Sequence, residues 1–270
     1  MTNGKSTNGT AVVTGASAGI GAKYAERLAE RGFDLVLVAR RTDRLEALAE
    51  TLRTRFGVTV RAVTADLGDR TQLEGVARQI GGDETLTLLV NNAGTSTLAP
   101  VSATDVAAAE TMNDLNIGAL VRLTLAVLPG MKSRDRGAIV NIGSVLGFRA
   151  LPISTIYSAT KAYVTFFTRG LIDELADTNV RVQLVAPAAT ATDIWEISGV
   201  PLTALDPATV MSVDAMVDAS IAGLDASESV TMPSVEESER LLADFDAATL
   251  ALLGASQTSA PASRYAIAAE

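Results

Sequence analysis

The sequence predicts an α/β protein: a single domain with one doubly wound, mostly parallel central sheet and helices on both faces. Two observations predict this class. Short β-branched runs alternate with longer stretches of helical period through the first half of the chain, as they do in βαβ units. In addition, 48% of the 270 residues are hydrophobic and only 20% are charged, so the chain can bury a sizeable core.

Strands are expected where short apolar and β-branched runs occur, because such side chains pack well on a pleated surface. The first run is TAVVT and the second is DLVLVA. A last, short candidate at 229–232 lies between two further helices. In chain order, the main expected strands cover residues 10–14, 34–39, 58–63, 86–90, 137–143 and 180–187.

Helices are expected between these strands, where Leu and Ala recur at intervals of three and four residues with Arg and Glu on the opposite face. Each helix therefore has an apolar face with which to cover the sheet. Strands and helices in this order build a Rossmann-like fold. The expected helices cover residues 20–31, 44–56, 71–79, 105–132 and 155–177.

No repeat or linker marks a second domain, so we expect one Rossmann-like domain over residues 10–254. Residues 1–9 are expected to form a flexible N-terminal tail, and 255–270 a C-terminal tail rich in small residues. Residues from about 187 to 212 hold three prolines and Trp195 without sustained periodicity. Such a segment is typical of a binding loop, and we expect it to be the substrate loop.

The composition excludes several kinds of function. A net charge of −9 opposes binding to nucleic acid. Without cysteine or histidine, the chain has no disulfide, no thiolate nucleophile, no Cys/His zinc site and no Ser-His-Asp triad, and no metal site is expected. The polar start and the lack of an apolar run of about 18 residues predict a cytoplasmic protein with no membrane partner.

The turn after the first strand, TGASAGIG, crowds three glycines among small residues. Gly15 can turn without a Cβ clash, Gly19 lets the backbone approach a ligand, and Gly21 permits close packing of the helix on the strand. The following helix presents unpaired N–H groups and a positive dipole end, which suit a pyrophosphate. Taken alone, the glycines also fit a tight turn without a ligand.

Tyr157 and Lys161 are four residues apart in an expected helix, so their side chains share one face. A nearby ammonium stabilises a phenolate, and we therefore expect Lys161 to lower the pKa of Tyr157 from about 10 toward neutrality. In a chain without histidine, Tyr157 is the best candidate for a general acid and base. On the helix alone, a surface pair without function is the alternative.

Four motifs together resemble the short-chain dehydrogenase/reductase family, and the resemblance runs from Thr10 to about Met232. The motifs are the TGxxxGxG spacing of the glycines, NNAG at 91–94, Ser144 in NIGSVLG, and YSATK starting at Tyr157. Their order and intervals are those of the family. The resemblance implies a Rossmann fold, a nicotinamide dinucleotide cofactor and a catalytic tetrad.

The resemblance also implies roles for single residues. Tyr157 would be the acid and base, Lys161 would hold the nicotinamide ribose, Ser144 would bind the substrate oxygen, and Asn116 would support Lys161 through water. Ala188 departs from the family, which usually has a glycine after this proline. The cofactor contacts that it implies are Gly15, Ser17, Gly19, Ile20, Gly21, Asp66, Leu67, Asn92, Tyr157, Lys161 and Thr192.

The choice between the two nicotinamide cofactors depends on the end of the second strand. NAD enzymes commonly place a carboxylate there, whereas NADP needs a cation for its 2′-phosphate. Arg40 stands where the acid would be, with Arg41 beside it, so NADP(H) is expected in preference to NAD(H). Two solvated arginines are the alternative, although they oppose the positive end of the helix dipole, and Asp43 lies close by.

The substrate pocket is expected between the segment after Ser144 and the substrate loop. Its apolar walls would suit a carbonyl with an apolar or aromatic substituent, and they come from Leu146, Phe148, Leu151 and Trp195. The sequence thus predicts an NADP-dependent oxidoreductase that interconverts a ketone or aldehyde and the corresponding alcohol by hydride transfer.

Two other functions stay open. An epimerase or dehydratase of the related extended group uses the same Tyr and Lys but usually has a larger C-terminal region. A dinucleotide-binding regulatory protein would leave Ser144, Tyr157 and Lys161 idle. Apolar residues on more than one face of 155–175 further predict a homodimer or homotetramer.

Overall fold

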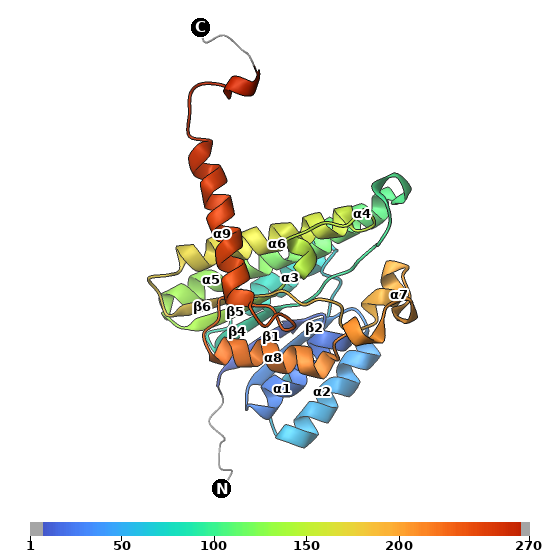
Figure 1. Cartoon of the computed structure of the whole chain (residues 1–270). Helices are drawn as coiled ribbons and strands as arrows, with labels where there is room; N and C mark the ends of the chain where they lie inside the picture. Colours follow the sequence, from blue (N-terminus) through green and yellow to red (C-terminus); the bar gives the residue numbers. More distant parts are fainter. Residues whose placement is uncertain (1–7, 266–270) are drawn as a thin grey trace. The chain divides into compact units, whose positions relative to one another are not determined.

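The computed structural model describes residues 8–265, and its centre is a parallel sheet of seven strands (Figure 1). The strand order is β3-β2-β1-β4-β5-β6-β7, so the direction of winding reverses between β1 and β4. Ligands of open α/β sheets lie at such a reversal, outside the carboxyl ends of the strands. The strands are β1 Thr10–Thr14, β2 Asp34–Ala39, β3 Val60–Thr64, β4 Leu86–Asn91, β5 Gly137–Ile142, β6 Val180–Val185 and β7 Val230–Thr231.

The strand register follows the sequence pattern closely. Val13 of β1 lies opposite Leu37 of β2 and Val90 of β4, in ladders that are parallel throughout. β3 begins at Val60, two residues later than expected, and the N–H of the preceding Thr59 donates to the carboxylate of Asp34 at 2.8 Å. The predicted doubly wound α/β class is confirmed.

Helices cover both faces of the sheet (Figure 1). The expected helix over 105–132 is interrupted by a π-helical segment, Asp114–Ala119, which the spacing of apolar residues did not indicate. The helices of the unit that holds the sheet are α1 Gly19–Glu30, α2 Thr42–Phe56, α3 Arg70–Gly81, α4 Val106–Asn113, α5 Leu120–Ser133, α6 Thr155–Glu174, α7 Ile194–Ser198 and α8 Val213–Asp225.

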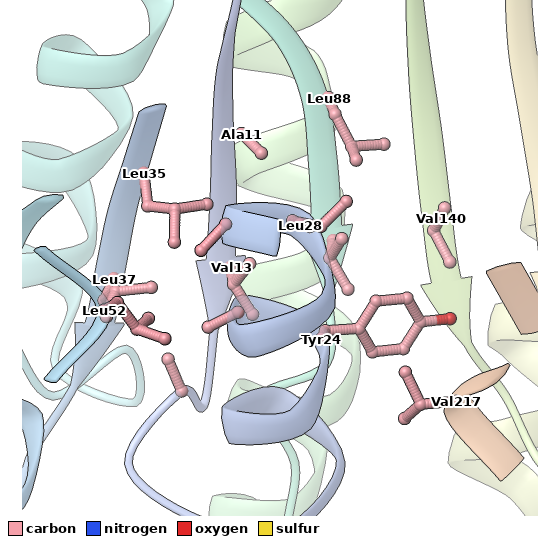
Figure 2. Packing of buried hydrophobic residues seen from close by; sticks show 14 of the residues in the cluster. Ala11, Val13, Tyr24, Leu28, Leu35, Leu37, Leu52, Leu88, Val140 and Val217 are labelled. Atoms are coloured by element: carbon pink, nitrogen blue, oxygen red, sulfur yellow. The ribbon is translucent and has the colours of Figure 1, made fainter. Parts of the chain in front are cut away.

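Two hydrophobic cores lie on opposite faces of the sheet because neighbouring strand residues point to opposite sides. Val13 belongs to the core under α1, α2 and α8, whereas the adjacent Val12 belongs to the core under α3, α5 and α6. Figure 2 shows the first core, in which Tyr24 and Leu28 of α1 lie against the sheet beside Val217 of α8. These layers fix the carboxyl ends of the strands, where the site is built.

The stretch Val106–Ser133, formed by α4, the π-helical segment and α5, is long and apolar enough to cross a membrane by length and composition, because it contains an 18-residue window with a mean hydropathy of 1.3. The sequence-based expectation that no such stretch exists was therefore wrong. In the fold, Leu123, Val127 and Met131 of this stretch are buried in the core under the sheet. Core helices meet the same criterion.

A second compact unit begins at residue 235 and holds helix α9, Ser238–Ala255. None of the residues of α9 is buried, and Leu250, Leu252 and Leu253 are exposed apolar side chains. The predicted tails, 1–9 and 255–270, lie partly outside the described residues. The domain limits given in the sequence analysis stay predictions.

Candidate active site

The glycine turn joins β1 to α1 and lies against the end of β4. A Cβ on Gly21 would be 2.5 Å from Nδ2 of Asn92 and 2.5 Å from the carbonyl oxygen of Gly15. Gly15 has φ +67°, which L side chains rarely adopt, and a Cβ there would be 2.8 Å from the same Asn92 nitrogen. The turn is therefore packed so closely on its neighbours that both positions need glycine.

The N-terminus of α1 fits an anionic group. Its N-cap is Ala18, which makes no side-chain capping bond, and no acidic residue lies in the first turn. The first N–H groups of a helix need partners, and the positive end of its dipole favours a phosphate. The residues present thus fit the pyrophosphate of a dinucleotide, with Ile20 of the same turn lining the neighbouring cavity.

A small polar network holds the end of β4 against the glycine turn. The Thr14 hydroxyl accepts from the N–H groups of Asn92 and Ala93, both at 2.9 Å, and Nδ2 of Asn92 donates to the Thr14 carbonyl at 2.8 Å. The Asn92 amide therefore braces the turn. Its expected position over the adenosine stays a prediction.

The residues predicted as acid, base and support meet at the carboxyl end of β5. Lys161 of α6 is 7% exposed, and its Nζ donates to the carbonyl of Ile142, the last residue of β5, at 2.9 Å. The same Nζ is 5.7 Å from the centre of the Tyr157 ring. Ser144 hydrogen bonds with Tyr157, and its Oγ also accepts from the Leu146 N–H at 3.1 Å.

The expected lowering of the Tyr157 pKa is not what the structure shows. Burial raises the pKa of Tyr157 to about 12, and the hydrogen bond with Ser144 only partly opposes that rise. Burial also lowers the pKa of Lys161 to about 8. The prediction was wrong for this state of the protein because it counted the charge of Lys161 but not the loss of water around both groups.

Gly147 lets the segment that carries Ser144 approach α6. A Cβ on Gly147 would be 2.5 Å from Oγ1 of Thr165 and 2.7 Å from the carbonyl oxygen of Lys161. Ser144 caps the short 3-10 turn Val145–Gly147 that contains this glycine. The turn that carries Ser144 therefore packs directly on α6, the helix of Tyr157 and Lys161, and the sequence analysis did not identify this contact.

Asn116 lies in the π-helical segment and is 2% exposed. Its Oδ1 accepts from the Thr95 N–H at 2.8 Å, and its Nδ2 donates to the Thr95 carbonyl at 2.9 Å and to the Thr160 hydroxyl at 3.0 Å. The Thr160 hydroxyl in turn donates to the carbonyl of Tyr157 at 2.8 Å. The side chain thus ties the loop after β4 to α6, and its expected support of Lys161 through water stays a prediction.

Three arginines, Arg40, Arg41 and Arg44, form what we call the arginine cluster at the end of β2 and the start of α2. Arg40 is 65% exposed in its side chain, and its guanidinium is 3.7 Å from the carboxylate of Asp66. Nε of Arg41 donates to the Ser17 hydroxyl of the glycine turn at 3.1 Å. Arg40, Arg41, Asp66 and Ser17, all predicted for the cofactor site, are therefore close together.

The side chain of Leu67 lies apart from the other residues predicted for the cofactor site. It is 3% exposed and belongs to the hydrophobic core on the α3 side of the sheet. Thr192 reaches the glycine turn, because a Cβ on Gly19 would be 3.2 Å from its methyl carbon. The start of the substrate loop thus contacts the predicted cofactor site.

A cavity of about 300 Å³ opens beside Ser144, Tyr157 and Lys161. Among the described residues that line it, Lys161 is the only charged one. Leu146, Leu151 and Trp195 are in its wall as predicted, and Ala188, which replaces the usual glycine, lines it as well.

Phe148 was assigned to this wall incorrectly. Its side chain packs beside Leu120, Val164 and Leu184 in a third hydrophobic cluster, because the short turn after Ser144 directs it toward α6 and β6.

Sequence reasoning missed part of the wall. Ser96 and Leu98 follow NNAG at the carboxyl end of β4 and line the cavity with Ser198 of α7. The Leu98 N–H donates to the Ser198 carbonyl at 3.0 Å, and Nε1 of Trp195 donates to the carbonyl of Thr190 at 2.8 Å. The general position of ligands at strand ends was the signal available for these residues.

A dinucleotide cradle at the switch point of a parallel sheet, next to a Tyr-Lys pair and an apolar cavity, defines a class: the dinucleotide-dependent oxidoreductases. Comparison with known proteins gives the family. Residues 9–199 match the family described as short chain dehydrogenase. The chain belongs to this family.

Solved structures resemble this chain over nearly its whole length. A short-chain dehydrogenase from Sphingobium yanoikuyae in complex with NADPH is 44% identical, with a TM-score of 0.91, over 95% of this chain and 100% of that one. A bulky-bulky ketone specific alcohol dehydrogenase from Comamonas testosteroni is 38% identical, with a TM-score of 0.86, over 95% of this chain and 98% of that one.

Curated relatives match over a shorter range. The very-long-chain 3-oxoacyl-CoA reductase of Anas platyrhynchos is 38% identical over 193 residues, which are 70% of this chain and 62% of that protein. The reductase of the same name from Homo sapiens is 38% identical over 191 residues, 69% of this chain and 61% of that protein. The match thus spans less than two thirds of these relatives.

Proposed function

We propose that this chain is an NADP(H)-dependent oxidoreductase that interconverts a bulky, uncharged ketone or aldehyde and the corresponding alcohol. The observation that carries the proposal is the meeting of Ser144, Tyr157 and Lys161 at one apolar cavity. When bound, the cofactor supplies or takes up the hydride at the carbonyl carbon. Tyr157 gives its phenolic proton to the carbonyl oxygen during reduction and regains it during oxidation of the alcohol.

The surroundings of Tyr157 suit this proton transfer. Its pKa of about 12 keeps the phenol protonated at neutral pH, and donation of this proton requires stabilisation of the phenolate. The adjacent Lys161 stabilises the phenolate that remains after the proton leaves. Ser144 hydrogen bonds the Tyr157 oxygen and lies where the substrate oxygen would be held.

The preference for NADP(H) is supported by the arginine cluster. Guanidinium groups bind phosphate through charge-assisted hydrogen bonds. Nε of Arg41 donates to the Ser17 hydroxyl of the glycine turn, and the adjacent Arg40 is exposed and lies 3.7 Å from Asp66. The similar dehydrogenase from Sphingobium yanoikuyae was solved in complex with NADPH.

The substrate class is supported by the walls of the cavity. Leu98, Leu146 and Trp195 offer apolar surface, and the only charged group in the described wall is Lys161. A neutral ketone with large apolar substituents therefore fits better than an anionic thioester. The similar enzyme from Comamonas testosteroni is named as specific for bulky-bulky ketones.

The proposal also covers the oligomeric state of the enzyme and its location in the cell. Exposed apolar side chains on α5 and α6, Leu125, Tyr163 and Phe166, support a homodimer or homotetramer formed through these helices. The acidic composition, with a net charge of −9, supports a cytoplasmic location. Sedimentation that gives only monomer at micromolar concentration would contradict the assembly.

The proposal is tested by titrating the purified protein with NADPH and, separately, with NADH. Aromatic, aliphatic and β-keto carbonyl compounds are then added while the absorbance of the reduced nicotinamide is followed. Tighter binding of NADPH and its oxidation by a bulky neutral ketone are expected. Binding without turnover on any compound would favour a regulatory protein, and binding of neither nucleotide would overturn the proposal.

A further inference from the structure

The substrate loop contacts the arginine cluster through a single carboxylate. Oδ2 of Asp193 is 3.4 Å from NH1 of Arg41 and 3.4 Å from NH1 of Arg44. Arg41 uses its Nε for the Ser17 hydroxyl of the glycine turn. The Asp193 carboxylate is therefore paired with Arg41, which we propose to bind the 2′-phosphate, and with Arg44 of the same cluster.

Asp193 is also the residue that directly precedes α7. The next two residues, Ile194 and Trp195, line the cavity, and Thr192 on its other side touches the glycine turn at Gly19. Asp193 therefore connects the arginine cluster to a segment that lines the cavity.

We infer that Asp193 is an internal anion that competes with the 2′-phosphate of the cofactor for Arg41 and Arg44. This inference rests on the proposed preference for NADP(H). A phosphate carries more charge than a carboxylate and repels it, so both anions cannot keep the same guanidinium nitrogens. Binding of the phosphate therefore displaces Asp193 and releases the start of α7 from the arginine cluster.

Two consequences follow for the enzyme. Asp193 lowers the affinity for nucleotides that carry a 2′-phosphate and leaves the affinity for those without it unchanged. It also makes the position of Trp195 depend on which cofactor is bound. Because these ion pairs are solvent-exposed, the effect of Asp193 on affinity is about two- to fivefold.

The test uses nucleotide fragments that lack the nicotinamide, so no turnover is involved. Adenosine 2′,5′-bisphosphate and adenosine 5′-monophosphate are titrated into the full chain by calorimetry. Trp195 is the only tryptophan, and its fluorescence reports on α7 in the same samples. The variants are Asp193→Asn and, as a matched control, Glu196→Gln, which removes one exposed negative charge from α7 itself.

The expected result is that Asp193→Asn binds the bisphosphate about two- to fivefold more tightly than the wild type and binds the monophosphate equally well. In the wild type, only the bisphosphate changes the Trp195 emission. Asp193→Asn shows the altered emission already without a ligand, and Glu196→Gln behaves as the wild type.

Other outcomes overturn the inference. An unchanged bisphosphate affinity in Asp193→Asn would show that no competition exists, while the cofactor preference would stand. An equal gain in bisphosphate affinity in Glu196→Gln would show that the effect comes from net charge and not from competition for the arginines. If wild type and Asp193→Asn both bind the two nucleotides equally, the proposed preference for NADP(H) itself fails, and the inference fails with it.

Discussion

The proposed catalytic group, which consists of Ser144, Tyr157, Lys161 and Asn116, is held in a different way from the arginine cluster. Lys161 is 7% exposed and bonded to the backbone of β5, and Asn116 uses its whole amide for Thr95 and Thr160. The arginines are largely solvent-exposed and rely on ion pairs of 3.4 to 3.7 Å.

This difference indicates where the protein is rigid and where it can adapt. Buried hydrogen bonds act in a low dielectric and cost much to break, whereas exposed ion pairs are screened and worth little. The proposed proton transfer, which needs fixed distances, takes place in the first region, and the proposed discrimination between NADP(H) and NAD(H) takes place in the second. Substitutions should therefore have large effects in the catalytic group and small effects in the arginine cluster.

The largest effect is expected for Tyr157→Phe, which removes the proton donor and keeps the ring. Turnover of an accepted ketone should fall by about 10²- to 10⁴-fold, while NADPH still binds. Absorbance of the reduced nicotinamide gives the rate, and fluorescence titration gives the binding. Tyr163→Phe, on an exposed position of the same helix, is the control and should keep full activity. Turnover above a tenth of the wild-type rate in Tyr157→Phe would show that Tyr157 is not the proton donor.

A second large effect is expected for Gly147→Ala. The new Cβ would lie 2.7 Å from the carbonyl oxygen of Lys161, so the turn that carries Ser144 must move away from α6. We expect turnover to fall by at least about tenfold, since misplacement of a catalytic group by 1 Å is costly. Gly170→Ala in α6 is the control, because its Cβ would meet nothing within 4 Å. Wild-type kinetics in Gly147→Ala would show that this contact does not position Ser144.

The buried ammonium of Lys161 should give the protein a characteristic pH dependence. Its pKa is lowered from 10.5 to about 8, so below pH 8 the folded state carries the full cost of the buried charge. Between about pH 8 and 10.5 the folded state loses this proton first. The unfolded state then binds more protons, and the Lys161 contribution to the free energy of unfolding rises with pH.

Urea unfolding at several pH values between 8 and 10 measures this rise. In Lys161→Met the rise should disappear, whereas the exposed control Lys132→Met should retain it. An equal slope in Lys161→Met and wild type would contradict the burial of a charged Lys161.

The smallest effect is expected for Arg40→Ser in the arginine cluster. Loss of one exposed guanidinium should weaken NADPH binding by about tenfold or less and leave NADH binding unchanged. Arg55→Ser, at the far end of α2 and paired with Glu26, should change neither. An equal loss of affinity for NADPH and NADH in Arg40→Ser would show that Arg40 does not contact the 2′-phosphate.

The difference between local sequence patterns and contacts between distant segments explains what the sequence could predict. The strands, the glycine turn and the Tyr157–Lys161 pair follow from local patterns, and the fold confirms the class of protein. The pKa of Tyr157 and the position of Phe148 depend on what surrounds them in three dimensions, and both predictions were wrong. Ser96 and Gly147 were missed because their importance lies in contacts with distant segments.

The π-helical segment Asp114–Ala119 has a consequence for how this site can be lost. A π turn closes hydrogen bonds between residues five apart, so it holds one residue more than an α turn. Deleting Ile117 would therefore allow a continuous α-helix through 106–133 in which α4 and α5 keep the faces that they now present. Asn116 would turn away from Thr95 and Thr160, and the loop after β4 would lose its tie to α6. A single inserted residue thus separates an ordinary surface-covering helix from one that braces a reaction centre.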